Sequence, residues 1–168
     1  MAKKILFVCL GNICRSPAAE GIMNALIEKN HRKGDMVCDS AGVTDWNVGS
    51  PPDARMTDHA RRRGYRLAGA ARQFDPATDF HRFDYIVTMD KKNLADVRAL
   101  ARNSEERSRI HPMTEFCRKF LTEEVPDPYY GGENGFEMVL DILEDACAGL
   151  LKHPEKTASV HDGLPTTA

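Results

Sequence analysis

Residues 5–17 read Ile5-Leu6-Phe7-Val8-Cys9-Leu10-Gly11-Asn12-Ile13-Cys14-Arg15-Ser16-Pro17, an apolar run that leads straight into a short polar loop. The apolar run predicts a buried strand. Ser16-Pro17 predicts a helix start, with serine as the cap and proline at the first helical position. Open α/β sheets bind anions where the carboxyl end of a strand meets the amino end of a helix. This stretch therefore predicts an α/β fold with an anion-binding loop after its first strand.

Apolar runs and helical patterns alternate along the whole chain. Strands are expected at residues 4–9, 36–38, 84–89 and 108–111. Helices are expected at residues 17–29, 53–63, 91–100, 113–120 and 134–152. The alternation predicts one domain, residues 1–152, built as a parallel sheet with helices on both faces. Residues 153–168 have no periodicity and are expected to form a mobile tail.

Composition excludes several classes of protein. The 168 residues include 23 Lys and Arg against 25 Asp and Glu, so neither a nucleic-acid partner nor a membrane surface is expected. No apolar run approaches the length of a membrane span. Five scattered cysteines argue against a disulfide framework and fit a cytoplasmic protein. Their spacing offers no zinc site, and no metal or cofactor is expected.

The loop has the residues needed to bind a phosphate group. The backbone N–H groups of residues 10–15 can curl into a nest of hydrogen-bond donors. Gly11 and Asn12 are residue types that tolerate the left-handed backbone that such a nest demands. Arg15 adds a planar guanidinium that can hold two phosphate oxygens.

Cys9 is placed to act as a nucleophile on that phosphate. The positive potential of the nest and of Arg15 favours its thiolate form, and Ser16 can donate a hydrogen bond to the sulfur. The predicted reaction is in-line attack on phosphorus, followed by hydrolysis of the cysteinyl-phosphate by water, without a metal. An ordinary buried cysteine is the alternative, and we adopt that interpretation for Cys38, Cys117 and Cys147. It does not explain the Gly, Asn, Arg and Ser residues that follow Cys9.

Cys14 leaves two interpretations open. It can form a disulfide with Cys9 under oxidising conditions, which would shield the nucleophile from irreversible damage. It can equally be a small side chain that packs within the loop.

Hydrolysis also needs an acid that protonates the leaving group, and Asp127 is the candidate. Prolines on both sides hold it in an extended loop, and the adjacent Tyr129 and Tyr130 can wall an aromatic pocket. An ordinary turn aspartate is the alternative for Asp127 taken alone. Together with the cysteine loop, the acid role is the stronger interpretation.

The chain resembles the low-molecular-weight protein-tyrosine phosphatases. Four blocks match that family in order: the loop Cys9–Ser16, the turn Asp39–Gly42, the segment Tyr85–Asp90 with Asn93, and Asp127–Tyr129. The segment Gly49–Arg55 also resembles the family. The matches cover roughly residues 4–152, and their order and spacing make the resemblance specific.

The resemblance implies a four-stranded parallel sheet and the hydrolysis of phosphotyrosine in proteins or peptides, with inorganic phosphate as the product. It implies Cys9 as the nucleophile, Arg15 as the clamp of the transition state, and Asp127 as general acid and then general base. It implies a hydrogen-bond network that holds the loop open, made by Asn12, Ser16 and Ser40. The substrate ring would be flanked by Trp46, Tyr129 and Tyr130. A place in the core is the alternative for Trp46, but the polar residues of its loop favour an exposed platform.

One position departs from the family pattern. Many members have a histidine two residues before the Ala-Arg-Gln segment, where this chain has Gly69 before Ala71-Arg72-Gln73. That histidine supports the loop asparagine, so another group is expected to hold Asn12 here.

Three rival functions share parts of this pattern. Relatives that dephosphorylate arginine have Thr at the position of Ile13, where a branched apolar residue favours an aromatic ring instead. Arsenate reductases use a relay of further cysteines, and no close pair of cysteines follows the loop. A module that only binds phosphate needs neither Cys9 nor Asp127. Phosphotyrosine hydrolysis is therefore the predicted function.

Overall fold

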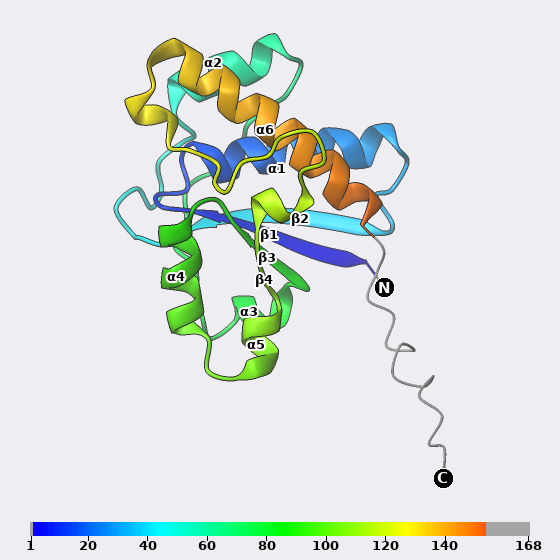
Figure 1. Ribbon diagram of the computed structural model, residues 1–168, viewed down its shortest axis with the longest axis vertical. Helices are drawn as coiled ribbons and strands as arrows, with labels where there is room; N and C mark the ends of the chain where they lie inside the picture. The colour runs from blue at the N-terminus through cyan, green and yellow to red at the C-terminus, as the bar shows by residue number, and fades with distance from the viewer. Residues whose placement is uncertain (1, 154–168) are drawn as a thin grey trace.

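A four-stranded parallel sheet forms the centre of the computed structural model, which describes residues 2–153 (Figure 1). The strands lie in the order β2-β1-β3-β4. Their bounds are Lys3–Cys9 for β1, Met36–Gly42 for β2, Tyr85–Thr88 for β3 and Ile110–Pro112 for β4. The three pairings between them are parallel, as the alternation of strands and helices predicted.

Helices cover both faces of the sheet, which confirms the predicted architecture (Figure 1). On one face lie α1 (Arg15–Lys29), α2 (Ala54–Arg62) and α6 (Gly132–Lys152), and on the other lie α3 (Asp79–Arg82), α4 (Lys91–Leu100) and α5 (Ser104–Ser108). Strand β1 separates two apolar cores, because its side chains alternate in direction. Ile5 and Phe7 pack with residues of α1 and α6. Leu6 and Val8 pack with residues of α3 and α4.

Strand β2 is longer than the sequence predicted. The local sequence predicts a turn at residues 39–42, yet these residues continue the strand as far as Gly42. They pair in register with β1, so that Gly42 lies beside Cys9. Pairing with a distant strand here outweighs the local turn preference. The extension brings Ser40 toward the carboxyl end of the sheet, where Cys9 lies.

Three shorter elements also differ from the expectation. Helices α3 and α5 have four and five residues, too few to show a periodicity in the sequence. Because α5 runs to Ser108, strand β4 starts later than expected. The helix expected at 113–120 is a short 3₁₀ helix, η1 (Met113–Phe116). Beyond it, the Asp145 carboxylate accepts the N–H groups of residues 118–120 and so holds that backbone outside a helix.

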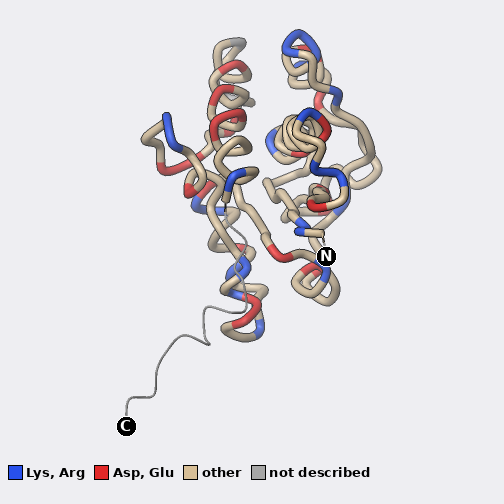
Figure 2. Tube along the Cα trace, turned by 90° about the vertical axis from the view of Figure 1, so that its right-hand side faces the viewer, with Lys and Arg blue, Asp and Glu red and all other residues tan. Residues whose placement is uncertain are grey.

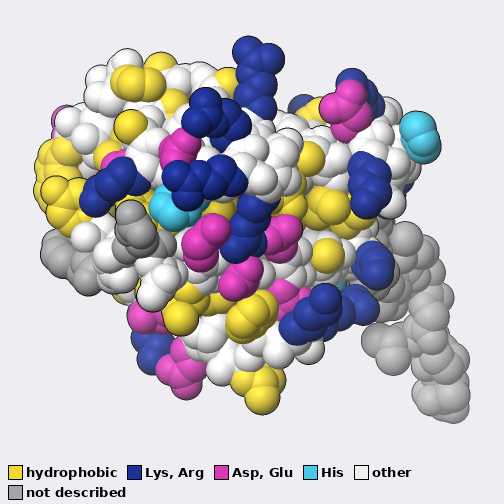
Figure 3. All heavy atoms as spheres, turned by 90° about the horizontal axis from the view of Figure 1, so that it is seen from above, with side chains coloured by type: hydrophobic (Ala, Val, Ile, Leu, Met, Phe, Trp, Pro, Cys, Tyr) yellow, Lys and Arg dark blue, Asp and Glu magenta, His cyan; other side chains and the backbone are white. Residues whose placement is uncertain are grey.

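The densest basic run of the chain, Arg61-Arg62-Arg63, lies at the end of α2 and is paired with acidic side chains. Arg61 and Arg62 both donate to Asp58 at 2.6 Å, and Arg63 forms ion pairs with α6. Figure 2 shows the two charges interspersed along the helices, and Figure 3 shows them together over the face seen from above. Ion pairs therefore balance the cations of this run.

The predicted mobile tail, residues 153–168, lies outside the described residues except for His153. The His153 ring packs edge-on against Phe116 with the ring centroids 5.3 Å apart. Its carbonyl oxygen accepts from Lys3 Nζ at 3.4 Å. No helix within residues 2–153 has the length and apolar character required to cross a membrane.

Candidate active site

The anion-binding loop expected from the sequence joins the last residue of β1 to the first residue of α1. Cys9 ends the strand with only 3% of its surface exposed, and residues 10–14 lead to Arg15, where the helix begins. The prediction that Ser16 caps this helix is wrong. Cys14 is the N-cap residue, and Ser16 lies inside the first turn with a buried side chain. The Ser16 hydroxyl is thereby available to Cys9.

The backbone of the loop is held from outside through its carbonyl oxygens. The oxygens of Cys9 and Leu10 accept from the N–H groups of residues 43 and 44, at 2.9 and 3.0 Å. The Ile13 oxygen accepts from the cap residue of α2 at 2.7 Å. Within the described part of the chain, by contrast, the N–H groups of residues 10–14 donate to no acceptor. Such a row of donors matches the needs of a bound phosphate.

Gly42, at the end of β2, makes room for this loop. A Cβ atom at this position would lie 2.9 Å from Gly11 C and 3.0 Å from Asn12 N, closer than ordinary van der Waals contact. Asn12 adopts the left-handed backbone predicted for it, with φ of 56°. The same prediction for Gly11 is wrong, and a side chain there would instead collide with Asn47. Because the contact is with the end of a flexible side chain, which can shift, neither backbone conformation nor a rigid neighbour requires glycine at position 11.

A buried chain of hydrogen bonds connects the loop to Cys9. Arg72 N donates to Asn12 Oδ1 at 2.9 Å, which turns the amide nitrogen of Asn12 toward two serines. That nitrogen donates to Ser16 Oγ and to Ser40 Oγ, each at 2.9 Å. Because Ser16 accepts from Asn12, its own proton is available to Cys9 Sγ at 3.0 Å, with a backbone oxygen at 3.4 Å as the more distant acceptor. The sulfur is thus placed as an acceptor, as a thiolate requires.

The position that lacks the family histidine is Gly69. It has a φ of +89°, and a Cβ atom there would meet nothing within 4 Å. The support of Asn12 comes instead from the backbone of Arg72, whose side chain is fixed by Asp39 and by the buried Asp79. A backbone N–H and two serines therefore hold Asn12 in this chain.

Arg15 is buried at the start of α1, and its guanidinium is fixed by two acceptors. Nη1 donates to Asp90 Oδ2 at 2.6 Å and to the Val125 oxygen at 3.0 Å. Burial lowers the pKa of Arg15, but the charges of Cys9 and Asp90 outweigh it and raise that pKa above its ordinary value. The sequence reasoning gave Asp90 no role, although it lies in a block that resembles the family. As the cap of α4, Asp90 accepts from Asn93 N with its other oxygen.

Asp127 caps the short helix η2 (Pro128–Tyr130) and accepts from Tyr129 N at 2.9 Å. Burial is the main cause of a raised pKa at Cys14, and the Asp127 carboxylate adds to it. The same carboxylate adds to the raised pKa of Arg15. The fold therefore brings Asp127 within electrostatic reach of the loop, from a distant part of the sequence.

Two of the three aromatic residues expected around the substrate have exposed side chains. Trp46 is 73% exposed, which excludes the alternative of a place in the core. Tyr129 is 66% exposed, and the side chain of Tyr130 lies outside what the structure describes. Arg55 stacks on the Tyr129 ring, 5.1 Å from its centroid, and on the Phe136 ring at 5.0 Å. The sequence reasoning missed this contact, which joins α2 to the loop of the candidate acid.

The other cysteines are held as thiols. Burial raises the pKa of Cys38 and of Cys147 well above the ordinary value, and it raises the pKa of Cys117 to about 12. Burial and the Asp53 charge raise the pKa of Cys14 in the same direction. All five cysteines are unpaired. These four thiols are therefore poorly suited to attack phosphorus.

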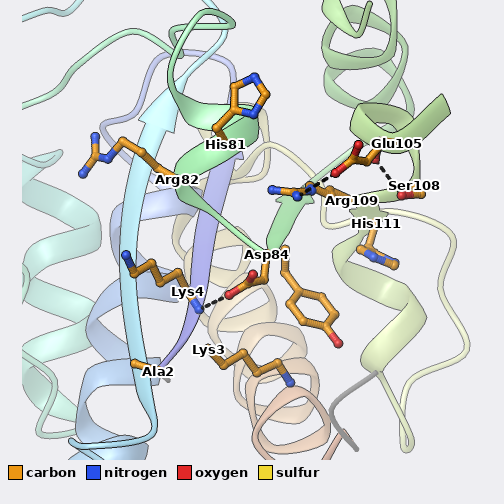
Figure 4. A pocket seen from close by; sticks show the side chains of 11 residues that line it. Ala2, Lys3, Lys4, His81, Arg82, Asp84, Glu105, Ser108, Arg109 and His111 are labelled. Carbon is orange, nitrogen blue, oxygen red and sulfur yellow. Dashed lines mark hydrogen bonds and ion pairs between the residues drawn. The ribbon is translucent and has the colours of Figure 1, made fainter. Parts of the chain in front are cut away.

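A cavity of about 820 Å³ lies at the opposite end of the sheet, where the strands begin (Figure 4). The two acids that line it are already engaged by neighbours. Glu105 accepts from Arg109 at 3.2 Å, and Asp84 accepts from Lys4 N at 2.9 Å. Arg109 also donates to the Phe80 oxygen at 2.6 Å, so its guanidinium stabilises the backbone of α3. Among the described residues, none of those predicted for the site lines this cavity.

The chain is similar over most of its length to proteins of one family. The family model described as low molecular weight phosphotyrosine protein phosphatase matches residues 4–160. A Synechocystis protein that carries this family's name is 51% identical over 148 residues, which is 88% of this chain and 94% of that protein.

Solved structures give the same result. A protein tyrosine phosphatase from Entamoeba histolytica has a TM-score of 0.85 and 42% identity, and the match covers 96% of this chain and 99% of that one. A Drosophila arginine phosphatase has a TM-score of 0.82 and 34% identity, with 89% and 96% covered. The chain therefore belongs to the low molecular weight phosphotyrosine protein phosphatases, a family of hydrolases.

Proposed function

We propose that the chain hydrolyses phosphotyrosine in proteins or peptides through a cysteinyl-phosphate intermediate on Cys9. The observation that carries the proposal is the row of N–H groups at residues 10–14, without an acceptor in the described chain, between a buried cysteine and Arg15. A bound phosphate would satisfy these donors and present its phosphorus to the sulfur. Family membership supports phosphotyrosine as the substrate class.

In the first step, the Cys9 thiolate attacks phosphorus in line with the bond to the tyrosine oxygen. As the S–P bond forms, the P–O bond breaks, and its electron pair goes to the leaving oxygen, which takes a proton from Asp127. The loop N–H groups and Arg15, itself fixed by Asp90, stabilise the charge on the equatorial oxygens. The Ser16 hydroxyl stabilises the thiolate before the attack.

In the second step, water attacks the phosphorus of the intermediate while the Asp127 carboxylate takes a proton from that water. The S–P bond breaks, inorganic phosphate leaves, and Cys9 returns as a thiolate with Asp127 protonated for the next cycle. Over the whole cycle, Asp127 gives one proton to the leaving oxygen and regains one from water, and Cys9 begins and ends as a thiolate.

Arginine dephosphorylation is the second candidate, because the Drosophila arginine phosphatase is a structural neighbour at 34% identity. Ile13 favours tyrosine, since a branched apolar side chain in the loop can pack against an aromatic ring. The exposed rings of Trp46 and Tyr129 add aromatic surface of the same kind.

A direct comparison of two peptides tests this choice. A phosphotyrosyl peptide and a phosphoarginyl peptide of otherwise identical sequence are compared by kcat/KM for phosphate release. We expect a preference for phosphotyrosine of at least about tenfold, the scale on which an apolar pocket discriminates. Ile13→Thr should narrow the preference, whereas Ile13→Val, which keeps the apolar branch, should preserve it. A preference for phosphoarginine in the unmodified chain would overturn the proposal.

The proposal places the enzyme in a reducing cytoplasm, which suits five unpaired cysteines and a thiolate nucleophile. It gives Cys14 the role of disulfide partner for Cys9 under oxidation, since a second thiol in the loop can trap a sulfenic acid before further damage. Mass spectrometry after peroxide treatment should find this disulfide. Sulfinic acid at Cys9 in its place would leave packing as the role of Cys14.

A further inference from the structure

We propose that Glu20, on α1, is a positioning residue that sets the direction of the hydrogen bonds leading to Cys9. The proposal rests on the function above, because it concerns Cys9 as a thiolate. Ser40 Oγ donates to Glu20 Oε1 at 2.7 Å, and the Glu20 side chain is partly buried. Glu20 lies outside the sequence blocks that predicted the site.

Each hydrogen bond in this series has only one possible direction, because the group at one end of the series can only donate. Arg72 N–H can only donate, so Asn12 presents its oxygen to Arg72 and its nitrogen to the two serines. The two N–H bonds of that nitrogen are then given to Ser16 and Ser40, each at 2.9 Å. Both serines must accept, so each hydroxyl proton points away from Asn12.

Those two hydroxyl protons need acceptors, and the structure offers a close one on each side, with the Ala41 oxygen at 3.4 Å as a more distant alternative for Ser16. The Ser16 proton faces Cys9 Sγ at 3.0 Å. The Ser40 proton faces Glu20 Oε1 at 2.7 Å. A hydroxyl that both accepts and donates is held best, because linked hydrogen bonds polarise and strengthen one another. Glu20 therefore does for Ser40 what Cys9 does for Ser16.

Loss of the acceptor at position 20 would release the Ser40 hydroxyl. Its proton could then turn toward the Asn12 amide and weaken one of the bonds that hold it. Asn12 carries the left-handed turn of the loop, with φ of 56°, so the loosening would reach the Ser16–Cys9 bond as well. We expect a less stable thiolate and a loop less well ordered for phosphate.

Other charged and titratable groups surround the two ends of this chain of bonds. Burial raises the pKa of Glu20, although its hydrogen bond from Ser40 opposes the shift. The groups that face Glu20 are Asp39, Arg72 and Cys38. The groups that face Cys9 are Arg15 and Cys14, with Asp127 acting on both of these. Substitutions at position 20 leave all of these residues in place, although Cys38 loses the Glu20 charge that adds to its raised pKa.

Two substitutions separate the acceptor from the rest of the side chain. Glu20→Gln keeps an oxygen that can accept from Ser40, whereas Glu20→Met keeps the length of the side chain and removes the acceptor. Glu28→Met, at an exposed glutamate of the same helix, is the matched control. The readout is the pH dependence of Cys9 alkylation by iodoacetate in the folded protein without substrate. The alkylated product is quantified on the peptide that contains Cys9. The second readout is kcat and KM for a phosphotyrosyl peptide.

We expect Glu20→Met to move the alkylation midpoint to higher pH and to lower kcat/KM by about three- to tenfold, the worth of one hydrogen bond. Glu20→Gln and Glu28→Met should match the unmodified chain. In the background of Ser40→Ala, Glu20→Met should add nothing, because its effect passes through Ser40.

An unshifted midpoint in Glu20→Met would overturn the proposal. So would a Glu20→Gln variant that behaves like Glu20→Met, or a loss of equal size with and without Ser40. The alkylation midpoint does not depend on turnover. A chain that shows the shifted midpoint but hydrolyses no phosphotyrosine would therefore refute the proposed function and leave the role of Glu20 standing.

Discussion

The two ends of the parallel sheet differ in how their polar groups are paired. At the amino ends of the strands, a cavity of about 820 Å³ has its acids engaged, Glu105 by Arg109 and Asp84 by Lys4 N. At the carboxyl ends, the loop after β1 leaves a row of N–H groups without acceptors in the described chain. Donors that lack acceptors, rather than volume, therefore mark the site.

The way in which helices connect the parallel strands explains this difference. In a parallel sheet whose strands are joined by crossover helices, each helix begins near the carboxyl end of the strand before it. The helix amino ends therefore bring unpaired N–H groups to that end of the sheet. Helices α1 and α4 both begin at this end, and the ion pair between Arg15 and the cap residue Asp90 joins their starts. We therefore expect changes at the carboxyl end to affect activity, and changes at the amino end to affect stability.

The largest effect is expected from Arg15→Lys. Lysine keeps the charge but lacks the planar fork that can hold two phosphate oxygens and the Asp90 carboxylate. The kcat/KM for a phosphotyrosyl peptide should therefore fall by about a hundred- to a thousandfold. Arg109→Lys, at the opposite end, is the matched control. It should keep the activity and lower the melting temperature, since Arg109 donates to two backbone oxygens. Similar losses of activity in both variants would contradict the expected difference between the two ends of the sheet.

The next largest effect is expected from Asp127→Asn. With phosphotyrosine, whose phenolate is a poor leaving group, kcat should fall by about a hundredfold because no proton is supplied. With an activated aryl phosphate, which leaves without a proton, the loss should be much smaller. Asp84→Asn, beside the cavity at the amino end, should change neither rate. An equal loss of rate on both substrates would count against the acid role.

A smaller loss is expected from Gly42→Ala. The added methyl would lie 2.9 Å from Gly11 C and must displace the loop backbone, so kcat/KM should fall by about tenfold. Gly34 precedes the amino end of β2, and a Cβ atom there meets nothing within 4 Å. Gly34→Ala should therefore keep full activity. Unchanged kinetics in Gly42→Ala would show that the loop need not be held so closely.

Arg102→Met should affect stability and leave activity unchanged. The hydrogen bonds from Arg102 lower the pKa of Glu106 from 4.5 to about 2. Because the folded pKa is the lower one, the pair stabilises the fold above pH 4.5, and this stabilisation is lost as the pH falls toward about 2. The gap in melting temperature between the unmodified chain and Arg102→Met should be open near neutrality and close in acid. A gap that does not vary with pH would contradict this assignment.

The part of the site that lies in one stretch of sequence could be predicted. The buried strand, the left-handed Asn12 and the placement of Cys9 and Arg15 follow from local chemistry and from the strand-to-helix connection. Two local expectations failed even there, and one was the left-handed backbone predicted for Gly11. Ser16 was expected to cap α1, but its hydroxyl lies among Cys9 and Asn12 instead.

The parts that could not be predicted are contacts between distant segments. Asp90 lies 75 residues from Arg15, and no local pattern shows that the two meet. Residues 39–42 have the local preference of a turn, and only their pairing with β1 makes them a strand that presents Ser40 to Asn12 and Glu20. Tertiary pairing decides such cases, because local propensities are weak beside it.

Trapping of the covalent intermediate is the most direct test of Cys9 as the nucleophile. The unmodified chain is mixed with an aryl phosphate, quenched in acid during turnover, digested and analysed by mass spectrometry. We expect one phosphoryl group on the peptide that contains Cys9, and neither this adduct nor turnover in Cys9→Ser. Steady release of phosphate with no phosphorylated Cys9, or with the phosphoryl group on another residue, would contradict this expectation.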